Sequence, residues 1–252
     1  MALPQIVSRD EWLAARLRLL DKEKAHTRAR DALNAERRRL PMVKITKDYQ
    51  FEGEDGTVSL AGLFDAGLSG SGLSGSGRAA GKCQLIIQHV MFGPDWETLC
   101  PGCSGALRES TPELRQHLLQ RDTNFVLVSR APYDKIAKEQ AERGIPFPWY
   151  SSFGSDFNFD FGVSFDPGIV PPAYNYRPAP DAAPSDEGPG FSCFLRDGDD
   201  VFHTYSTFAR GAEYTGNAYT LLDMTAMGRQ EDWEEPKGRA INPRPAGPFF
   251  SD

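Results

Sequence analysis

Two cysteines separated by two residues, Cys100-Pro-Gly-Cys103, constrain this chain more than any other feature of its sequence. They follow an apolar run from Gln84 to Phe92, which has the composition of a buried strand, and a short loop from Gly93 to Leu99. Pro101 suits the first position of a helix, because proline lacks an N–H and its φ is already helical. The spacing therefore predicts a strand, a loop and a helix that begins at the cysteine pair.

The segments after the cysteines continue the alternation of strands and helices. Asn124 to Ser129 is apolar and predicts a second buried strand, and Tyr133 to Arg143 predicts a charged helix that ends at Gly144. An irregular stretch precedes a hairpin from Phe191 to Phe208, whose turn falls at Asp197 to Asp200. Parallel strands joined by helices place helices on both faces of a sheet. This order predicts a thioredoxin-like α/β fold with a mixed central sheet, and it puts the cysteines at the carboxyl end of the first strand.

The outer parts of the chain divide it into three regions. Residues 1–45 are expected to form an N-terminal helical arm, in which Ser8 and Glu11 make a capping box and the helix stops before Pro41. The thioredoxin-like domain should cover 46–230, with a hairpin between Tyr49 and Leu60 and a flexible Gly/Ser insertion at 67–79. An irregular tail should cover 231–252.

Composition narrows the classes of partner. The chain of 252 residues carries a net charge of -7, which argues against a general nucleic-acid binder. Its apolar runs are too short to cross a bilayer and no secretory signal is visible, so we expect a cytoplasmic protein with no membrane partner. Four cysteines in such a chain are expected to be reduced thiols. The basic N-terminal arm leaves a homodimer open.

The cysteine pair has a chemistry that follows from its place at a helix start. If Cys100 caps the helix, the free N–H groups of Gly102 and Cys103 face its sulfur, and with the helix dipole they favour the thiolate. Cys100 would then attack as the nucleophile, and Cys103, one turn deeper, would resolve the mixed disulfide. Gly102 would allow the close approach that ring closure needs. This predicts a thiol–disulfide oxidoreductase that acts on a thiol or disulfide substrate or a reductant protein and needs no cofactor.

A metal site is one alternative, because a single CxxC is ambiguous. Zinc sites usually contain a second cysteine pair, whereas Cys83 and Cys193 stand alone. Zinc or copper would have to recruit two histidines, and the candidate ligand set is Cys100, Cys103, His89 and His203.

Two further alternatives remain. A peroxiredoxin-like peroxidase carries Pro, Thr and Cys in the pattern PxxxTxxC. Pro94 and Thr98 have the right mutual spacing, but only one residue separates Thr98 from Cys100. A scaffold that uses the fold without chemistry is the last alternative.

Some residues outside the cysteine motif could support a site. On an extended strand His203 and Tyr205 share one face, where they could line a pocket or simply face solvent. His89 is better explained as a core imidazole that is hydrogen-bonded to backbone. Pro189, just before the hairpin, is the best candidate for the cis proline that thioredoxin-like enzymes place opposite their disulfide.

An aromatic-rich segment follows the second helix. Phe147-Pro-Trp149 and Phe157-Asn-Phe-Asp-Phe161 could wall a substrate site, but a core of irregular backbone explains them better. Asp156 and Asp160 could act as a carboxylate pair, although alternation of Asp with Phe more simply indicates one wet and one dry face.

Several phrases of the sequence together resemble one family. They are His89-Val-Met-Phe-Gly-Pro-Asp-Trp96, Cys100-Pro-Gly-Cys-Ser104, Ser129-Arg-Ala-Pro132, Phe147-Pro-Trp149 with Ser151-Ser152, Asp156-Phe-Asn158, and Phe202-His-Thr-Tyr-Ser-Thr207 with Arg210-Gly211. The chain from about residue 8 to Arg239 resembles domain-of-unknown-function family 899, a thioredoxin-like family of bacteria and fungi related to AhpC and thioredoxin. The resemblance implies a thioredoxin-like fold with its redox site at Cys100 and Cys103. It implies no substrate, and it brings Trp96 into the set of supporting residues.

The chain departs from the family in two places. They are the Gly/Ser insertion and Thr225-Ala-Met227, where the family tends to have a Thr-Pro pair. Neither departure touches the cysteines.

Overall fold

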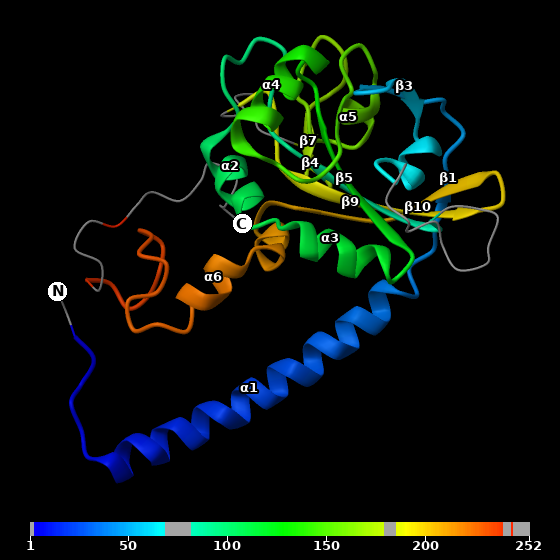
Figure 1. The fold of residues 1–252 in the computed structure, drawn as a ribbon. Coiled ribbons are helices and arrows are strands. Elements are labelled where there is room, and N and C mark those ends of the chain that lie inside the picture. Colours follow the sequence, from blue (N-terminus) through cyan, green and yellow to red (C-terminus); the bar gives the residue numbers. More distant parts are fainter. Residues whose placement is uncertain (1–2, 69–81, 179–184, 239–242, 244–252) are drawn as a thin grey trace. The chain divides into compact units, whose positions relative to one another are not determined.

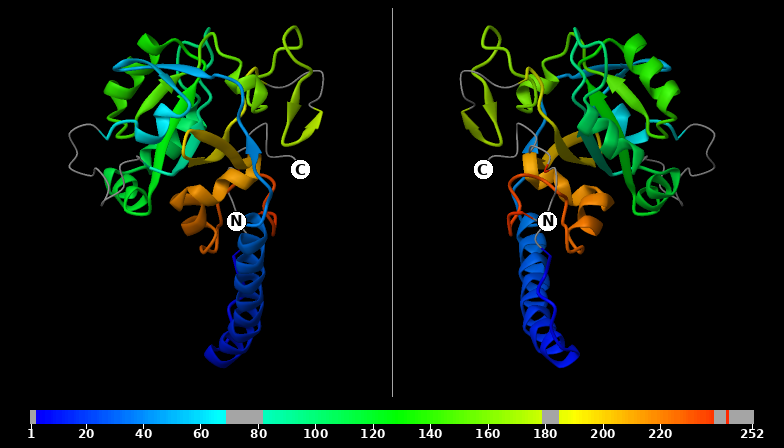
Figure 2. Two further views of the ribbon diagram at one scale, coloured as in Figure 1. Left: turned by 90° about the vertical axis from the view of Figure 1, so that its right-hand side faces the viewer. Right: turned by 90° about the vertical axis from the view of Figure 1, so that its left-hand side faces the viewer.

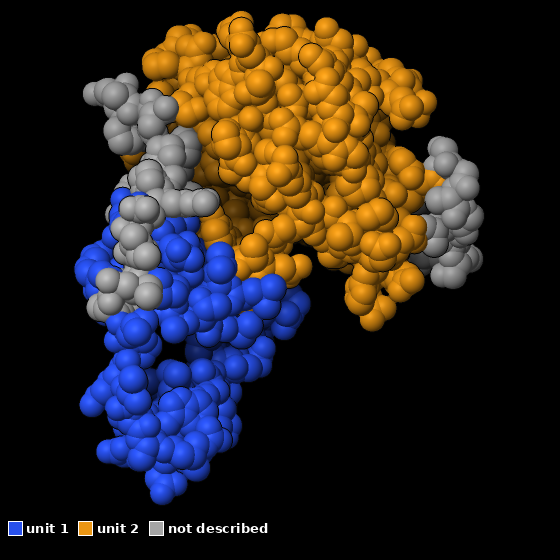
Figure 3. Space-filling model, turned by 60° about the vertical axis from the view of Figure 1, so that its left-hand side comes forward, with its two compact units in different colours: residues 1–41, 221–246 blue, residues 42–220, 247–252 orange. Residues whose placement is uncertain are grey.

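The computed structural model describes residues 3–68, 82–178, 185–238 and 243. The Gly/Ser insertion predicted at 67–79 lies outside these ranges except for its first two residues, and so does most of the tail beyond residue 238. The chain divides into two compact units (Figure 3): residues 1–41 with 221–246, and residues 42–220 with 247–252.

The first unit contains the predicted N-terminal helix, α1 (Arg9–Arg37). The capping box is present as predicted, because the Ser8 hydroxyl accepts from the Glu11 N–H at 3.3 Å and the Glu11 carboxylate accepts from the Ser8 N–H at 2.9 Å. No side chain of α1 is buried. The capping box, rather than tertiary burial, is thus what fixes where this helix begins.

The second unit is built on an eight-stranded sheet with the order β1-β10-β9-β4-β5-β6-β2-β3 (Figure 1). Its strands are β1 (Val43–Lys44), β2 (Gln50–Gly53), β3 (Gly56–Ser59), β4 (Gln84–His89), β5 (Thr123–Ser129), β6 (Trp149–Ser151), β9 (Gly190–Asp197) and β10 (Asp200–Phe208). The helices of this unit are η1 (Gly62–Asp65, a 3₁₀ helix), α2 (Pro101–Arg108), α3 (Pro112–Leu119), α4 (Tyr133–Arg143), α5 (Phe157–Asp160) and η2 (Ala209–Thr215, also 3₁₀). A last helix, α6 (Asn217–Leu222), follows η2.

The strand directions identify the fold. β4 and β5 are parallel and are joined through α2 and α3, whereas β9 is antiparallel to β4 and forms a hairpin with β10. β6 extends the parallel part beyond β5. A parallel pair joined by helices and followed by an antiparallel hairpin on the other side of the first strand is the thioredoxin-like arrangement, as the sequence predicts.

Side chains alternate across this sheet and form two cores. The first core lies on one face, where Leu85 and Ile87 of β4 pack with Val126 of β5, Leu63 of η1 and Phe157 of α5. The second core lies on the other face and joins these strands to α2 and α4. Its members include Phe125, Leu127, Leu107 and Ile136 together with Cys103. The alternation of the strands therefore decides which face a residue of the site can reach.

Several elements differ from the sequence-based expectation. α3 separates α2 from β5, and its N-cap is Thr111, whose hydroxyl accepts from the Leu114 N–H at 3.3 Å. The stretch expected to be irregular before the hairpin of β9 and β10 contains β6 and α5, and also the hairpin of β7 (Ala173–Tyr174) and β8 (Arg177–Pro178). This hairpin forms a small sheet of its own (Figure 2).

Within the described residues, no helix combines the length and the apolar character needed to cross a bilayer.

Candidate functional site

Cys100 caps α2, as the sequence predicts. Its backbone is extended, with φ -50° and ψ 128°, Pro101 stands at the start of the helix, and the Cys100 N–H donates to the Met91 carbonyl at 3.2 Å. Both cysteines are free thiols. Cys100 is half-buried whereas Cys103 is only 7% exposed. The pair therefore presents one reachable sulfur and one buried behind it.

The two thiols have opposite acid–base character. A hydrogen bond from the Cys103 side chain, assisted by the backbone N–H groups of Cys103 and Gly102, lowers the pKa of Cys100 to about 6 despite its partial burial. The same contact with Cys100, together with burial, raises the pKa of Cys103 well above its ordinary value. A hydrogen bond from the backbone of Met91 to the Cys103 sulfur opposes this rise. At neutral pH the site thus holds a thiolate at position 100 and a thiol at position 103.

Gly102 is not required for space in this arrangement. A Cβ added to Gly102 would lie 3.8 Å from the Cys100 sulfur, which is an ordinary van der Waals contact. The expectation that Gly102 allows the approach needed for ring closure concerns the disulfide form and stays a prediction. Gly102 contributes its N–H group, which any residue other than proline would also supply.

Pro189 precedes β9 as predicted, but its peptide bond is trans. The described residues contain a cis bond elsewhere, at Glu235–Pro236. The prediction of a cis proline at this position is thus wrong. Gly190, which follows Pro189, already belongs to β9. The Pro189 carbonyl instead accepts from the Tyr174 hydroxyl at 2.7 Å.

Tyr174 is a residue near the cysteines that sequence reasoning missed. Its hydroxyl also accepts from the Ala209 N–H at 2.9 Å, and burial and the nearby Cys103 sulfur raise its pKa. Tyr174 comes from the short strand β7, whose neighbours carry no periodic pattern, so only its aromatic character could have drawn attention to it.

Trp96 packs against the second core, as Cys100 does, and connects the loop before α2 to a charged cluster. Its indole N–H donates to Asp186 at 2.9 Å. The neighbouring Glu187 is fully buried, accepts from the Arg130 guanidinium at 2.6 Å and from the Ser164 hydroxyl at 2.7 Å, and has its pKa raised to about 7 by burial. Sequence reasoning missed this ion pair, because its two partners are 57 residues apart.

His203 and Tyr205 do not share a face, which corrects the prediction. His203 pairs with Phe194 and Tyr205 pairs with the adjacent Cys193, so Thr204 is an extra residue in a β-bulge. The bulge places His203 on the same face as Ser206, where their side chains are 2.7 Å apart. Tyr205 belongs to the opposite face, next to Cys193.

The alternative metal ligands are not brought together. His89 continues the alternation of Leu85 and Ile87 and contacts the ring of Phe157 of the first core in a tilted arrangement, whereas the cysteines belong with the second core. The described residues contain no group of three His, Cys, Asp or Glu side chains arranged to hold a metal ion. His89 is a core imidazole as predicted, but its partner is the Ser192 hydroxyl rather than backbone, and burial lowers its pKa to about 3.

The aromatic segment is mostly core, as the sequence indicates, since Phe147, Trp149 and Phe157 are at most 2% exposed. The two carboxylates Asp156 and Asp160 do form a pair, but Lys47 bridges them, with its Nζ 2.7 Å from each. The two carboxylates therefore belong to an ion-pair cluster with one ammonium, whose net charge is -1.

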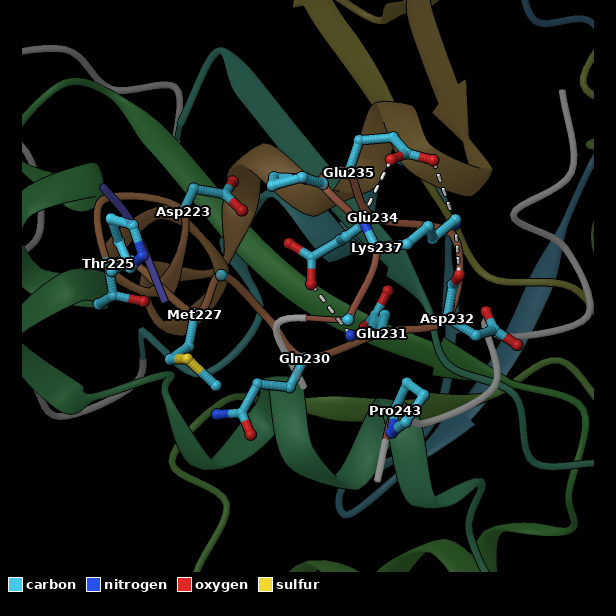
Figure 4. A pocket seen from close by; sticks show the side chains of 15 residues that line it. Asp223, Thr225, Met227, Gln230, Glu231, Asp232, Glu234, Glu235, Lys237 and Pro243 are labelled. Carbon is cyan, nitrogen blue, oxygen red and sulfur yellow. Dashed lines mark hydrogen bonds and ion pairs between the residues drawn. The ribbon is translucent and has the colours of Figure 1, made fainter. Parts of the chain in front are cut away.

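The first unit has an acidic cavity of about 410 Å³ (Figure 4). Carboxylates in its wall accept hydrogen bonds from backbone N–H groups of the same segment. Glu234 accepts from the Glu231 N–H at 3.0 Å, and Glu235 accepts from the Lys237 N–H at 3.1 Å. The Lys237 ammonium donates to the Asp232 carbonyl at 2.7 Å. We interpret these contacts as capping of an irregular segment.

Among solved structures, the chain is similar to peroxiredoxin Q of Xanthomonas campestris, with 15% identity, a TM-score of 0.40, and coverage of 66% of this chain and 84% of that chain. Peroxidoxin BcpB of Mycobacterium tuberculosis shows 17% identity and a TM-score of 0.38, with 66% and 86% covered. A secreted disulfide oxidoreductase of Mycobacterium tuberculosis shows 13% identity and a TM-score of 0.33, with 66% and 90% covered. Likenesses this weak carry no argument, so the fold assignment rests on the strand order and directions above.

Curated proteins give no match to the chain. A family model does match, over residues 1–243, and its description is a bacterial protein of unknown function, DUF899. The match spans nearly all of both units and includes the cysteine pair. The chain therefore belongs to the DUF899 family.

Proposed function

We propose that the protein is a thiol–disulfide oxidoreductase in which Cys100 is the nucleophile and Cys103 the resolving thiol. The observation that carries the proposal is the difference between the two thiols at the start of α2. Cys100 is half-buried and its pKa is lowered to about 6, whereas Cys103 is buried and its pKa is raised. A thiolate that can be reached and a thiol held in reserve are what disulfide exchange requires.

The exchange would proceed in two steps. The Cys100 thiolate attacks one sulfur of a substrate disulfide, the substrate S–S bond breaks, and the departing thiolate takes up a proton from water. Cys103 then releases its proton to solvent and attacks the Cys100 sulfur, which expels the second substrate thiolate, and that group is protonated in turn. Two electrons pass from the cysteine pair to the substrate disulfide, which becomes two thiols; one of the two protons is balanced by Cys103 and the other is taken from solvent, because Cys100 starts as the thiolate. A dithiol reductant would return the Cys100–Cys103 disulfide to its starting state.

The chain's own backbone would assist both steps. The N–H groups of Gly102 and Cys103 stabilise negative charge on the Cys100 sulfur, which keeps it ionised for the attack of the first step. The hydrogen bond from Met91 stabilises the Cys103 thiolate as it forms. Because Cys103 is buried, it reacts with the Cys100 sulfur once the substrate is attached there, and it is shielded from other reagents.

The test is the rate of alkylation of each cysteine against pH, read by mass mapping of the labelled peptides. We expect the rate at Cys100 to inflect near pH 6, while Cys83 and Cys193 in the same sample serve as internal controls. Cys103→Ala should move the Cys100 inflection upward, because the Cys103 side chain is the largest cause of the lowered pKa. Cys103→Ser keeps a hydroxyl donor and should move it less.

Trapping provides the second readout. With an aromatic disulfide reagent, Cys103→Ser should keep half of the reagent on Cys100 as a stable mixed disulfide, whereas the parent protein should release both halves. An inflection at the value of an ordinary thiol, or a Cys103→Ser variant that traps nothing at position 100, contradicts the proposal.

A further inference from the structure

A second concave site lies on the sheet face opposite the cysteines. It is a cavity of about 420 Å³, and we call it the aromatic cavity. Five aromatic rings contribute to its wall: Tyr49, Phe159, Phe161, Tyr176 and Phe208. Phe161 packs against the first core, whereas Cys100 packs against the second, so the cavity and the dithiol draw on different cores. The two sites approach each other at Tyr174, which lies near the Cys103 sulfur and contacts the Phe208 ring of the cavity wall. The volume falls within the range of small-molecule sites.

Four polar side chains form a hydrogen-bonded row at one wall of the aromatic cavity. His89 Nε2 lies 2.8 Å from Ser192 Oγ, Ser192 Oγ lies 2.8 Å from Ser206 Oγ, and Ser206 Oγ lies 2.7 Å from His203 Nε2. Ser206 and His203 line the cavity, while His89 and Ser192 lie buried behind them. The row thus ends at the cavity wall.

The direction of the hydrogen bonds along this row follows from the tautomer of His89, the residue at its buried end. His89 is 1% exposed, and its Nδ1 has no hydrogen-bond partner. If Nδ1 carried the proton, a buried N–H would be left without an acceptor, so the Nε2–H form is favoured. His89 then donates to Ser192, Ser192 donates to Ser206, and Ser206 is left with one proton that it can give to His203 or to a molecule in the cavity. Ser206 and His203 together can therefore both donate to and accept from a ligand.

The aromatic cavity lies beside an ion-pair cluster in which Lys47 contacts both Asp156 and Asp160. The Asp160 carboxylate at its wall accepts from the Tyr49 hydroxyl and the Lys47 ammonium, each at 2.7 Å. Burial lowers the pKa of His203, so its ring is neutral at neutral pH. The described wall residues thus offer aromatic surface and a neutral donor–acceptor pair, and the nearby Asp156–Lys47–Asp160 cluster, of net charge -1, disfavours an anion.

We propose that the aromatic cavity is a binding site for a small uncharged aromatic alcohol, of the size of a phenol or a naphthol. Its ring packs against the aromatic wall, and its hydroxyl exchanges hydrogen bonds with Ser206 and His203. The site is separate from the cysteine pair and does not depend on the function proposed for it.

Fluorescence titration with 2-naphthol tests the site on the full chain, since the emission of this probe changes when it leaves water. We expect saturable binding of one probe per chain, displaced by phenol. We also expect 2-naphthoate, which has the same rings but carries a charge, to bind more weakly than 2-naphthol. Equal or tighter binding of 2-naphthoate would overturn the argument from charge.

Three variants locate the probe. Tyr176→Ala removes a wall ring that is 73% exposed and should weaken binding about 2- to 10-fold. Tyr214→Ala removes an equally accessible tyrosine, 72% exposed and outside the cavity, and should change nothing. Ser206→Ala breaks the row and should weaken binding by a similar factor of about 2 to 10.

Two controls accompany these variants: one tests whether Ser206→Ala folds, and the other tests whether binding is independent of the cysteine pair. Because Ser206 is buried, its variant is compared with the parent by thermal unfolding, and Tyr176→Ala keeps the test decisive if Ser206→Ala does not fold. Cys100→Ser should bind 2-naphthol as the parent does. Absence of saturable binding, or equal binding by Tyr176→Ala and Tyr214→Ala, would refute the site, and a loss of binding in Cys100→Ser would refute its separateness.

Discussion

At the scale of single residues, the contrast between Cys100 and Cys103 arises from position along one helical turn. The backbone N–H groups of the first turn help to lower the pKa of the N-cap sulfur, whereas the sulfur three residues on is covered by the second core. This contrast follows from the CxxC spacing and Pro101, and the sequence therefore predicts it. The charges around the site do not follow in that way, because Glu187 and Arg130 meet only after the chain has folded.

Glu187 gives a prediction about pH. Its pKa is raised from 4.5 to about 7 in the folded protein. Between these two pH values the carboxyl is protonated in the folded state and ionised in the unfolded state. The stabilisation associated with this carboxyl is fully present below pH 4.5 and is lost as the pH rises through about 7. Urea unfolding should show a fall of roughly 1 to 3 kcal/mol across this window relative to Glu187→Gln, which cannot titrate.

A matched control separates this effect from other titrating groups. Glu142→Gln replaces an exposed carboxylate on α4 and should keep the parent profile. The outcome that contradicts the prediction is a constant difference in unfolding free energy between Glu187→Gln and the parent at every pH. The buried carboxyl would then not titrate in this window.

At the scale of elements, substitution by alanine should change the free energy of unfolding in opposite directions at two glycines that have open space around them. Gly144 ends α4 in the left-handed region with φ 62°, whereas Gly105 lies within α2, and a Cβ at either would meet no atom within 4 Å. Gly144→Ala should cost about 1 kcal/mol of unfolding free energy through backbone strain. Gly105→Ala should gain about 0.5 to 1 kcal/mol, because alanine is the better helix former.

Urea unfolding measures the free energy of unfolding of both variants, and we expect its dependence on urea concentration to be the same as in the parent. The pair is informative because side-chain crowding is absent at both sites, so any difference in sign comes from the backbone. Destabilisation of both variants by similar amounts would mean that something other than φ limits these positions.

Elements with a local signal could be predicted, and elements that depend on partners could not. Ser8, Pro101 and Gly144 each fix a helix end by a local rule, and all three ends agree with the structure. β6 has only three residues and exists because β5 offers an edge to pair with. The bulge at Thr204 likewise depends on register with β9, so strict alternation assigned Tyr205 to the wrong face.

At the scale of the whole molecule, the alternation of β4 separates two kinds of chemistry. Residues on the face of Leu85 and Ile87 lead to His89 and its row of hydroxyls, while the other face packs under α2 and the cysteines. A sequence lists His89 and Cys100 eleven positions apart, which suggests one site. The sheet places them on opposite faces, which is why the mixed Cys–His metal set does not assemble.

The last prediction concerns the N-terminal arm. Because α1 buries none of its side chains, a chain that begins at Met42 should keep both cores of the sheet, which draw on residues from Tyr49 onward. We expect this truncated chain to unfold at the same temperature as the full chain, with the Cys100 alkylation still inflecting near pH 6. Far-ultraviolet circular dichroism should show the loss of helix that removal of α1 entails. Ser8→Ala in the full chain is the control, since it should weaken only the start of α1, by about 1 kcal/mol in helix stability, and leave the unfolding of the sheet unchanged. A lower unfolding temperature of the truncated chain would mean that the arm stabilises the sheet through contacts that do not bury its side chains.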